Sequence, residues 1–101
     1  MPQTQAQLFM VVATLRDDVD MEEIAALRAA EHQQLAVLNA EGKVGAHHLS
    51  LPRRTAFLEV IAPDVEDASR TLATLPFATF FEVDIYPLGT PAPPAGEAAA
   101  T

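Results

Sequence analysis

The chain has 101 residues, half of them apolar, and a formal net charge of −8 at pH 7. This length accommodates one domain with a modest core, and the apolar content excludes a disordered chain. The negative charge argues against binding to nucleic acid or to an anionic membrane by bulk attraction. Because there is no cysteine, disulfides, thiolate metal sites and a cysteine nucleophile are excluded.

The first expected element is a strand. Residues 1–7 are polar and are expected to form a loose tail, whereas the run LFMVVATL at 8–15 is apolar and rich in β-forming residues. Such a run indicates a central strand covered on both faces. It is too short to span a membrane, and the polar start lacks the basic region of a signal peptide. We therefore expect a cytoplasmic protein.

A helix of about five turns is expected over 20–42. Asp20 with Glu23 resembles a capping box, and Gly42 is a typical residue just after a helix end. The large apolar residues recur at helical spacing: Ile24, Leu27, Leu35 and Leu38. Glu31 falls in the middle of this apolar stripe. Such a carboxylate is either paired for structure or chemically active, because desolvation raises its pKa toward neutrality, where a general base works best.

The rest of the chain repeats the alternation of strands and helices. Strands are expected over 43–51, 55–62 and 79–88, with a turn at 52–54 and a second helix over 64–75. The expected core-facing residues are Ala56, Leu58, Val60 and Ala62, then Val65, Ala68, Leu72 and Leu75, then Phe81, Val83 and Ile85. Residues 89–101 are rich in proline and alanine, which predicts a mobile tail or one draped over a neighbour.

The order β-α-β-β-α-β predicts an α+β fold, the ferredoxin-like split βαβ arrangement with an antiparallel sheet. Two helices cover one face of such a sheet and leave the other bare. The bare face is expected to carry Thr55, Phe57, Glu59, Ile61 and the row from Phe80 to Tyr86. Exposed aromatic residues on that face favour association with a second sheet, so we expect at least a homodimer.

Five short segments carry a resemblance to a known family. They are VDM at 19–21, the pattern L-[KR]-A-x-E at 27–31, the helix end Glu41-Gly42, Ala-Pro-x-Val at 62–65, and LP followed by an alternating strand at 75–88. In order and spacing they resemble the muconolactone Δ-isomerases, over a domain at 8–88. No single segment is a strong motif. The resemblance implies a dimeric α+β barrel, assembled into larger rings, and a cofactor-free proton transfer between carbons of an unsaturated lactone.

The resemblance assigns a catalytic position to Glu31, which matches a glutamate of the family pattern, while Arg28 matches a lysine. Several other expected pocket residues are replaced. The replacements are His32 for a lysine, Val44 and His48 for tryptophans, Met10 and Arg53 for histidines, and Leu49 for an arginine. The pocket lining therefore differs from the family pattern, and the three histidines His32, His47 and His48 become the candidate partners of Glu31.

His47 and His48 are neighbours in an expected strand, so their side chains point to opposite faces. If Leu49 faces the helices, His47 does so too and meets Glu31, whereas His48 faces a partner sheet. His32 lies about 80° around the helix from the centre of the apolar stripe, where a surface position is the alternative. No metal site is expected, because adjacent strand histidines cannot both reach one ion and no third ligand is suitably spaced.

Three charged residues are candidates for substrate binding. Arg53 and Arg54 in the expected turn can bind a carboxylate through charge-assisted hydrogen bonds, with solvated surface arginines as the alternative. Glu59 interrupts an apolar central strand. The favoured interpretation of Glu59 is a polar cleft between subunits with arginine or threonine partners.

We expect a cofactor-independent isomerase that moves a proton by general acid–base catalysis in an unsaturated lactone or enol. A polyketide cyclase or a cofactor-free monooxygenase of the same fold is the alternative among enzymes. A non-catalytic ligand-binding or assembly module is the alternative from another class. The expected partners are a small-molecule substrate and further copies of the chain, with no cofactor, nucleic acid or membrane.

Overall fold

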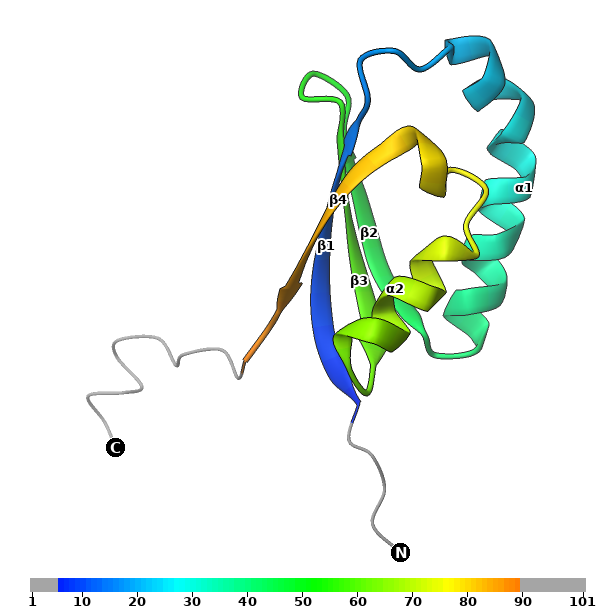
Figure 1. Ribbon diagram of the computed structural model, residues 1–101. Helices are drawn as coiled ribbons and strands as arrows, with labels where there is room; N and C mark the ends of the chain where they lie inside the picture. Colours follow the sequence, from blue (N-terminus) through cyan, green and yellow to red (C-terminus); the bar gives the residue numbers. More distant parts are fainter. Residues whose placement is uncertain (1–5, 90–101) are drawn as a thin grey trace, which may run out of the picture.

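The computed structural model describes residues 6–89, so most of the two expected tails, 1–5 and 90–101, lies outside the described residues. Six regular elements and one short 3₁₀ helix follow in chain order (Figure 1). They are β1 (Gln7–Leu15), α1 (Met21–Ala40), β2 (Val44–Ser50), β3 (Thr55–Ala62), α2 (Val65–Ala73), η1 (Ala78–Phe80) and β4 (Phe81–Pro87). The expected order of strands and helices is confirmed, with small shifts at the element ends.

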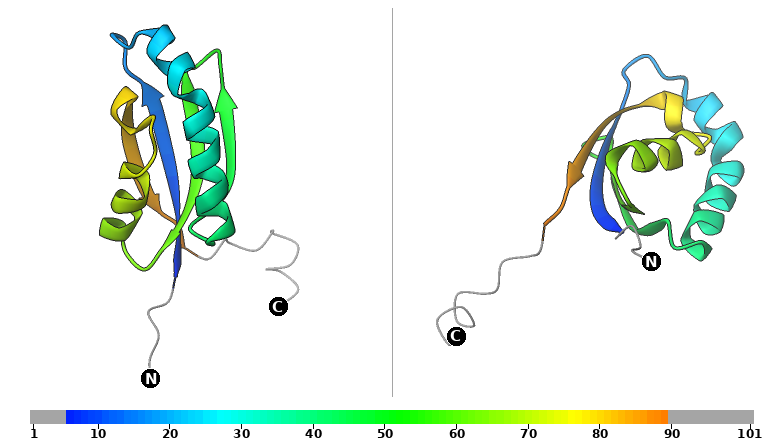
Figure 2. Two further views of the ribbon diagram at one scale, coloured as in Figure 1. Left: turned by 90° about the vertical axis from the view of Figure 1, so that its right-hand side faces the viewer. Right: turned by 60° about the horizontal axis from the view of Figure 1, so that its bottom comes forward.

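The four strands form one antiparallel sheet in the order β2-β3-β1-β4. β1 and β3, the two most apolar strands, occupy the centre as expected. Both helices pack on the same face of the sheet (Figure 2). The chain is thus a small α+β fold whose strand order agrees with the ferredoxin-like arrangement.

The core lies between the sheet and the two helices. Its buried residues are Phe9, Val11, Leu38, Val44, Leu58, Val60, Ala62, Ala68 and Leu75, with Leu35, Leu72 and Ile85 packed against them. Alternate residues of β1 and β3 enter this core because successive side chains of a strand point to opposite faces. Three expected core residues are wrong: Leu27, Val65 and Val83 are 37%, 47% and 41% exposed. Val65 is the first residue of α2, and Val83 lies on the edge strand β4.

The N-terminus of α1 is capped by Asp20, but not as a complete capping box. Its carboxylate accepts a hydrogen bond from the backbone N–H of Glu22 at 2.9 Å, whereas the expected box uses the N–H of Glu23. Glu23 instead donates its N–H to the Asp20 carbonyl oxygen. One side-chain cap therefore satisfies a free amide at this helix end.

The C-terminus of α1 closes with the expected glycine. Gly42 has φ +74°, in the left-handed region. Its N–H bonds to the carbonyl of Asn39, and the N–H of Lys43 bonds to the carbonyl of Leu38. This pair of bonds is the Schellman arrangement, which turns the chain sharply from α1 into β2.

Replacing Gly42 by Ala is expected to destabilise the protein by about 1 kcal/mol, because an L side chain is strained at this φ. Urea denaturation measures the change. Gly89→Ala is the matched control, since Gly89 does not have such a φ and a Cβ there meets nothing within 4 Å. Equal effects of the two substitutions would contradict the left-handed requirement at Gly42.

The last strand begins later than expected. Ala78–Phe80 form the 3₁₀ helix η1, and β4 starts at Phe81. The expected alternating row therefore loses Phe80, whose ring lies 5.9 Å from that of Phe77 (centroid to centroid). The expected orientation of Phe81 is confirmed, because it pairs with Leu15 at the end of β1.

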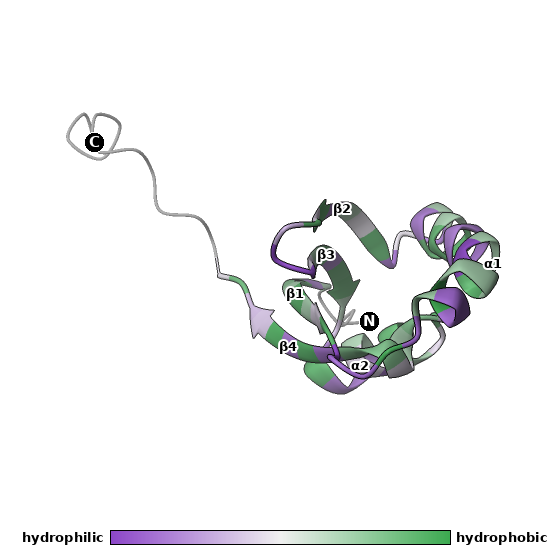
Figure 3. Ribbon diagram, turned by 90° about the horizontal axis from the view of Figure 1, so that it is seen from above, coloured by the Kyte–Doolittle hydropathy of each residue, from purple (hydrophilic) through white to green (hydrophobic). Residues whose placement is uncertain are grey.

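The face of the sheet opposite the helices carries no other element of the described chain (Figure 3). Leu8, Phe57 and Tyr86 are exposed on it, at 36%, 37% and 52%. These positions follow from the strand register, in which Phe57 lies opposite Val12 and Tyr86 opposite Met10. The expected bare face, with aromatic residues on it, is confirmed.

Candidate active site

The polar residue buried among the apolar ones is Glu31, which is 7% exposed. It shares its helix stripe with Ile24 and Leu38, each about two turns away. These three are the buried residues of α1. The sequence pattern that placed a carboxylate among core residues is therefore confirmed.

One oxygen of Glu31 is held by the backbone. The N–H of Phe77 donates to Oε1 at a distance of 2.9 Å. Phe77 precedes the first residue of η1, so its amide has no partner within that helix. A second hydrogen bond, from the amide of Gln34 to the hydroxyl of Thr74 at 3.0 Å, ties the same connection to α1. The segment between α2 and β4 is thus anchored on α1.

The other oxygen of Glu31 is free of such a bond. No ion pair of residues 6–89 involves Glu31, so the structural pairing considered from the sequence is not an ion pair within these residues. Within this part of the chain, every fully buried side-chain oxygen or nitrogen has a hydrogen-bond partner. Because only Oε1 is hydrogen-bonded, Oε2 keeps contact with solvent.

The environment of Glu31 changes its acidity. Desolvation by burial raises the pKa of the carboxyl above its ordinary value of 4.5. The Phe77 N–H and the electrostatic interactions with His32 and His47 act in the opposite direction, and burial prevails. A carboxyl with a raised pKa is better matched to general base catalysis near neutral pH than an exposed one.

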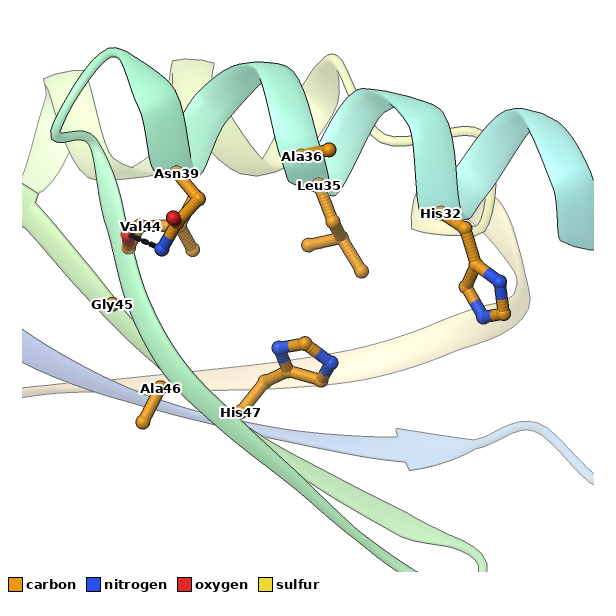
Figure 4. A pocket seen from close by; sticks show the side chains of 8 residues that line it. All are labelled: His32, Leu35, Ala36, Asn39, Val44, Gly45, Ala46 and His47. Atoms are coloured by element: carbon orange, nitrogen blue, oxygen red, sulfur yellow. Dashed lines mark hydrogen bonds between the residues drawn. The ribbon is translucent and has the colours of Figure 1, made fainter.

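A cavity of about 650 Å³ lies between α1 and β2. Its lining residues are His32, Leu35, Ala36, Asn39, Val44, Gly45, Ala46 and His47. The rings of His32 and His47 enter it from opposite sides, one from the helix and one from the strand (Figure 4). Glu31 is not itself a lining residue, but it precedes His32 on α1 and both imidazoles act on its charge.

The strand register decides which histidine of β2 faces the cavity. His47 lies opposite Leu58, whose side chain is buried under the helices, and His48 lies opposite Phe57 on the bare face. The expected orientations of both histidines are confirmed. His32 is exposed, as the surface alternative supposed, yet it also lines the cavity. The structure therefore brings together Glu31, His32 and His47, and leaves His48 outside.

The two arginines of the β2–β3 turn do not reach the cavity. Both are exposed. Arg54 has φ 50° and donates from Nη2 to the carbonyl oxygen of Arg16 at 3.1 Å, and its own carbonyl accepts from the N–H of Leu15. Arg54 thus fastens the turn to the end of β1. The expected role of Arg53 and Arg54 in substrate binding is not supported by their position, since neither is among the cavity residues.

Glu59 has a backbone partner within its own chain. Its carboxylate Oε1 accepts the backbone N–H of Ala46 at 2.9 Å, and the expected arginine or threonine partner across a subunit interface stays a prediction. Glu59 is on the bare face, because it lies opposite Met10, the neighbour of Phe9 and Val11 in β1. The bond joins β3 to the irregular part of β2.

Asn39 is a cavity residue that the sequence pattern did not single out. It donates from Nδ2 to the carbonyl oxygen of Val44 at 3.1 Å, which joins the end of α1 to the start of β2. His32, Leu35, Ala36 and Asn39 recur at spacings of three and four residues. That recurrence is a second helical stripe beside the core stripe, and it is the signal that could have identified Asn39.

Within residues 6–89 there is no group of three or more residues of the types His, Cys, Asp and Glu placed to hold a metal ion. The same residues contain no helix that is both long and apolar enough to span a bilayer.

A comparison with models of known protein families found no match, and a search among curated proteins found no significant similarity. The function is therefore inferred from the residues of the site.

The raised pKa of Glu31 predicts a pH dependence of stability. The folded protein binds this proton more tightly than the unfolded chain, so the stabilisation is complete below pH 4.5 and is lost as pH rises through the raised pKa. We expect the unfolding free energy of the wild type to fall relative to that of Glu31→Gln between acidic and neutral pH. Urea denaturation at a series of pH values measures this difference. A wild type whose unfolding free energy rises relative to that of Glu31→Gln over this pH range would contradict the raised pKa.

Proposed function

We propose that this protein is a cofactor-independent isomerase that moves a proton within an unsaturated lactone or enol. The ligand would occupy the cavity between α1 and β2. Glu31 would remove a proton from a carbon next to the carbonyl group or conjugated with it. The same carboxyl would then return the proton to another carbon of the conjugated system, so that a double bond moves and no redox step is needed.

The histidines would stabilise the intermediate. Removing the carbon proton leaves a dienolate with negative charge on the carbonyl oxygen, and hydrogen-bond donors at that oxygen lower the barrier. His32 and His47 enter the cavity from opposite walls. Either ring can donate an N–H to that oxygen, and His47 is the preferred candidate because its strand fixes its direction.

The observation that best supports this proposal is that the two oxygens of the Glu31 carboxyl have different surroundings. The residue is 7% exposed, one oxygen is anchored by an amide, and the other keeps contact with solvent. An anchored carboxyl with a raised pKa and a free oxygen has the features of a positioned general base. The resemblance of residues 27–31 to the muconolactone Δ-isomerase pattern supports the same assignment.

A non-catalytic binding module is the second candidate. The Phe77 bond favours it, because Glu31 also joins α1 to the connection between α2 and β4. In that case the cavity would bind a small molecule without changing it, and Glu31 would serve stability alone. A polyketide cyclase or cofactor-free monooxygenase would use the same cavity with a different substrate.

The bare face of the sheet supports a homodimer as part of the proposal. Phe57 and Tyr86 are exposed on a sheet face without helices, and a second copy of the same face would cover them. Sedimentation velocity is expected to give the mass of two or more chains. Phe57→Lys is expected to shift the protein toward the monomer, whereas Leu51→Lys, at a turn residue that is 74% exposed, is expected to leave the mass unchanged.

The experiment that tests the reaction uses deuterium exchange. The protein is incubated in D₂O with muconolactone and with other unsaturated lactones, and proton NMR follows the signals of the carbon-bound protons. We expect protein-dependent deuterium incorporation, with movement of the double bond in at least one substrate. Tight binding of these lactones without exchange would favour the binding module and overturn the isomerase.

A further inference from the structure

Between Val44 and His47, β2 contains one residue more than the stretch of β3 with which it pairs. Val44 lies opposite Val60 and His47 opposite Leu58, so the two residues Gly45 and Ala46 face the single residue Glu59. This two-against-one arrangement is a β-bulge, which interrupts the regular alternation of side chains. It lies directly before the histidine that enters the cavity.

The bulge decides which of the two histidines of β2 enters the cavity. Val44 is on the helix-facing side, since it is buried opposite the buried Val60. In a strand with strict alternation from Val44, Ala46 and His48 would face the helices, and His47 would face the bare side. Because of the extra residue, His47 faces the cavity and His48 does not.

The side chain of Glu59 holds this bulge from the opposite face of the sheet. Its Oε1 accepts the N–H of Ala46 at 2.9 Å. A Cβ built on Gly45 would lie 2.5 Å from the same oxygen and 3.3 Å from the Glu59 Cβ. The absence of a side chain at Gly45 therefore leaves room for the Glu59 carboxylate to reach the Ala46 amide. This bond satisfies a bulge amide that lacks a partner in the strand ladder.

We propose that Glu59 is a positioning residue, whose bond to the bulge amide of Ala46 selects His47 over His48 as the strand histidine of the cavity. Glu59 does not touch the cavity and acts only through the backbone of β2. This inference rests on the proposed function only for the use made of His47. The orientation of His47 itself can be measured without a substrate.

The test is NMR spectroscopy of the intact protein with labelled histidine, leucine and alanine. In the wild type, nuclear Overhauser effects are expected between the His47 ring and the methyl groups of Leu35, and none between the His48 ring and Leu35. In Glu59→Ala we expect the His47 effects to weaken or disappear and the Ala46 amide to exchange roughly tenfold faster, as for the loss of one hydrogen bond.

Glu59→Gln is the conservative control, because its amide oxygen can still accept the Ala46 N–H. It is expected to keep the His47 effects and the slow exchange, which a merely electrostatic role of Glu59 would not. Gly45→Ala is a second variant that leaves Glu59 in place and displaces its carboxylate by steric contact. It is expected to reproduce the Glu59→Ala spectrum and to add little to it in the double variant.

Deletion of Ala46 tests most directly whether Glu59 acts through the bulge. It removes the extra residue, so regular alternation from Val44 again directs His47 to the cavity. In this background Glu59→Ala is expected to have no effect on the His47 ring. Persistence of the His47 effects in Glu59→Ala with the bulge present would overturn the proposal, as would equal losses in Glu59→Gln and Glu59→Ala. Neither result would affect the assignment of Glu31, which is tested by deuterium exchange.

Discussion

Replacing Glu31 by Gln is expected to slow deuterium exchange into a lactone substrate by about 10²–10⁴-fold, the range of a lost general base. Glutamine has nearly the same shape and can still accept the Phe77 N–H through its amide oxygen. It cannot remove a proton from carbon. The fold is therefore expected to stay intact while the reaction is lost, and the rate is measured by proton NMR in D₂O.

Glu23→Gln is the matched control for this substitution. Glu23 lies on the same helix, is exposed, and its removal changes the net charge by the same amount. Its exchange rate is expected to equal that of the wild type. A Glu31→Gln protein with full activity would rule out Glu31 as the base, and an equal loss in Glu23→Gln would indicate an effect of overall charge.

Replacing Glu31 by Ala is expected to lower the unfolding free energy by about 1–3 kcal/mol, the cost of a buried donor left without its partner. The Phe77 amide loses its acceptor, and the anchorage of η1 on α1 is weakened. Urea denaturation gives the stability, and hydrogen exchange at the Phe77 amide reports the local effect.

Two further variants test whether the loss of stability in Glu31→Ala comes from the lost acceptor of the Phe77 amide. Glu31→Gln is expected to stay close to the wild type or above it at neutral pH, because burial disfavours the charged carboxylate. Gln33→Ala, an exposed change on the same helix, is expected to stay within about 0.5 kcal/mol. If Glu31→Ala were as stable as Gln33→Ala, the hydrogen bond from Phe77 to Glu31 would not contribute to the unfolding free energy.

The sequence was sufficient for the element order and for the burial of Glu31. Strict alternation in 55–62 predicted which side of β3 is buried, because a strand has a period of two residues. Helical periodicity placed Glu31 among core residues without any contact information. Gly42 marked the helix end because few other residues adopt a left-handed φ at low cost.

The features that the sequence did not predict depend on contacts between distant segments. The bulge at Gly45 and Ala46 has no local signature beyond one glycine, and the Glu59 bond that holds it links β3 to β2. The Phe77 amide reaches Glu31 across 46 positions of the chain. Leu27 was expected in the core because periodicity gives the direction of a side chain but not which elements pack against it.

The most direct test of Glu31 as the base is a comparison of two pH titrations. Carbon NMR of the labelled carboxyl gives the pKa of Glu31, and the rate of deuterium exchange as a function of pH gives the pKa of the catalytic group. We expect the carboxyl to titrate above 4.5, and the rate to rise with pH with the same midpoint, since only the ionised carboxylate removes the proton. A carboxyl that titrates at or below 4.5, or a rate that does not follow its ionisation, would contradict the assignment.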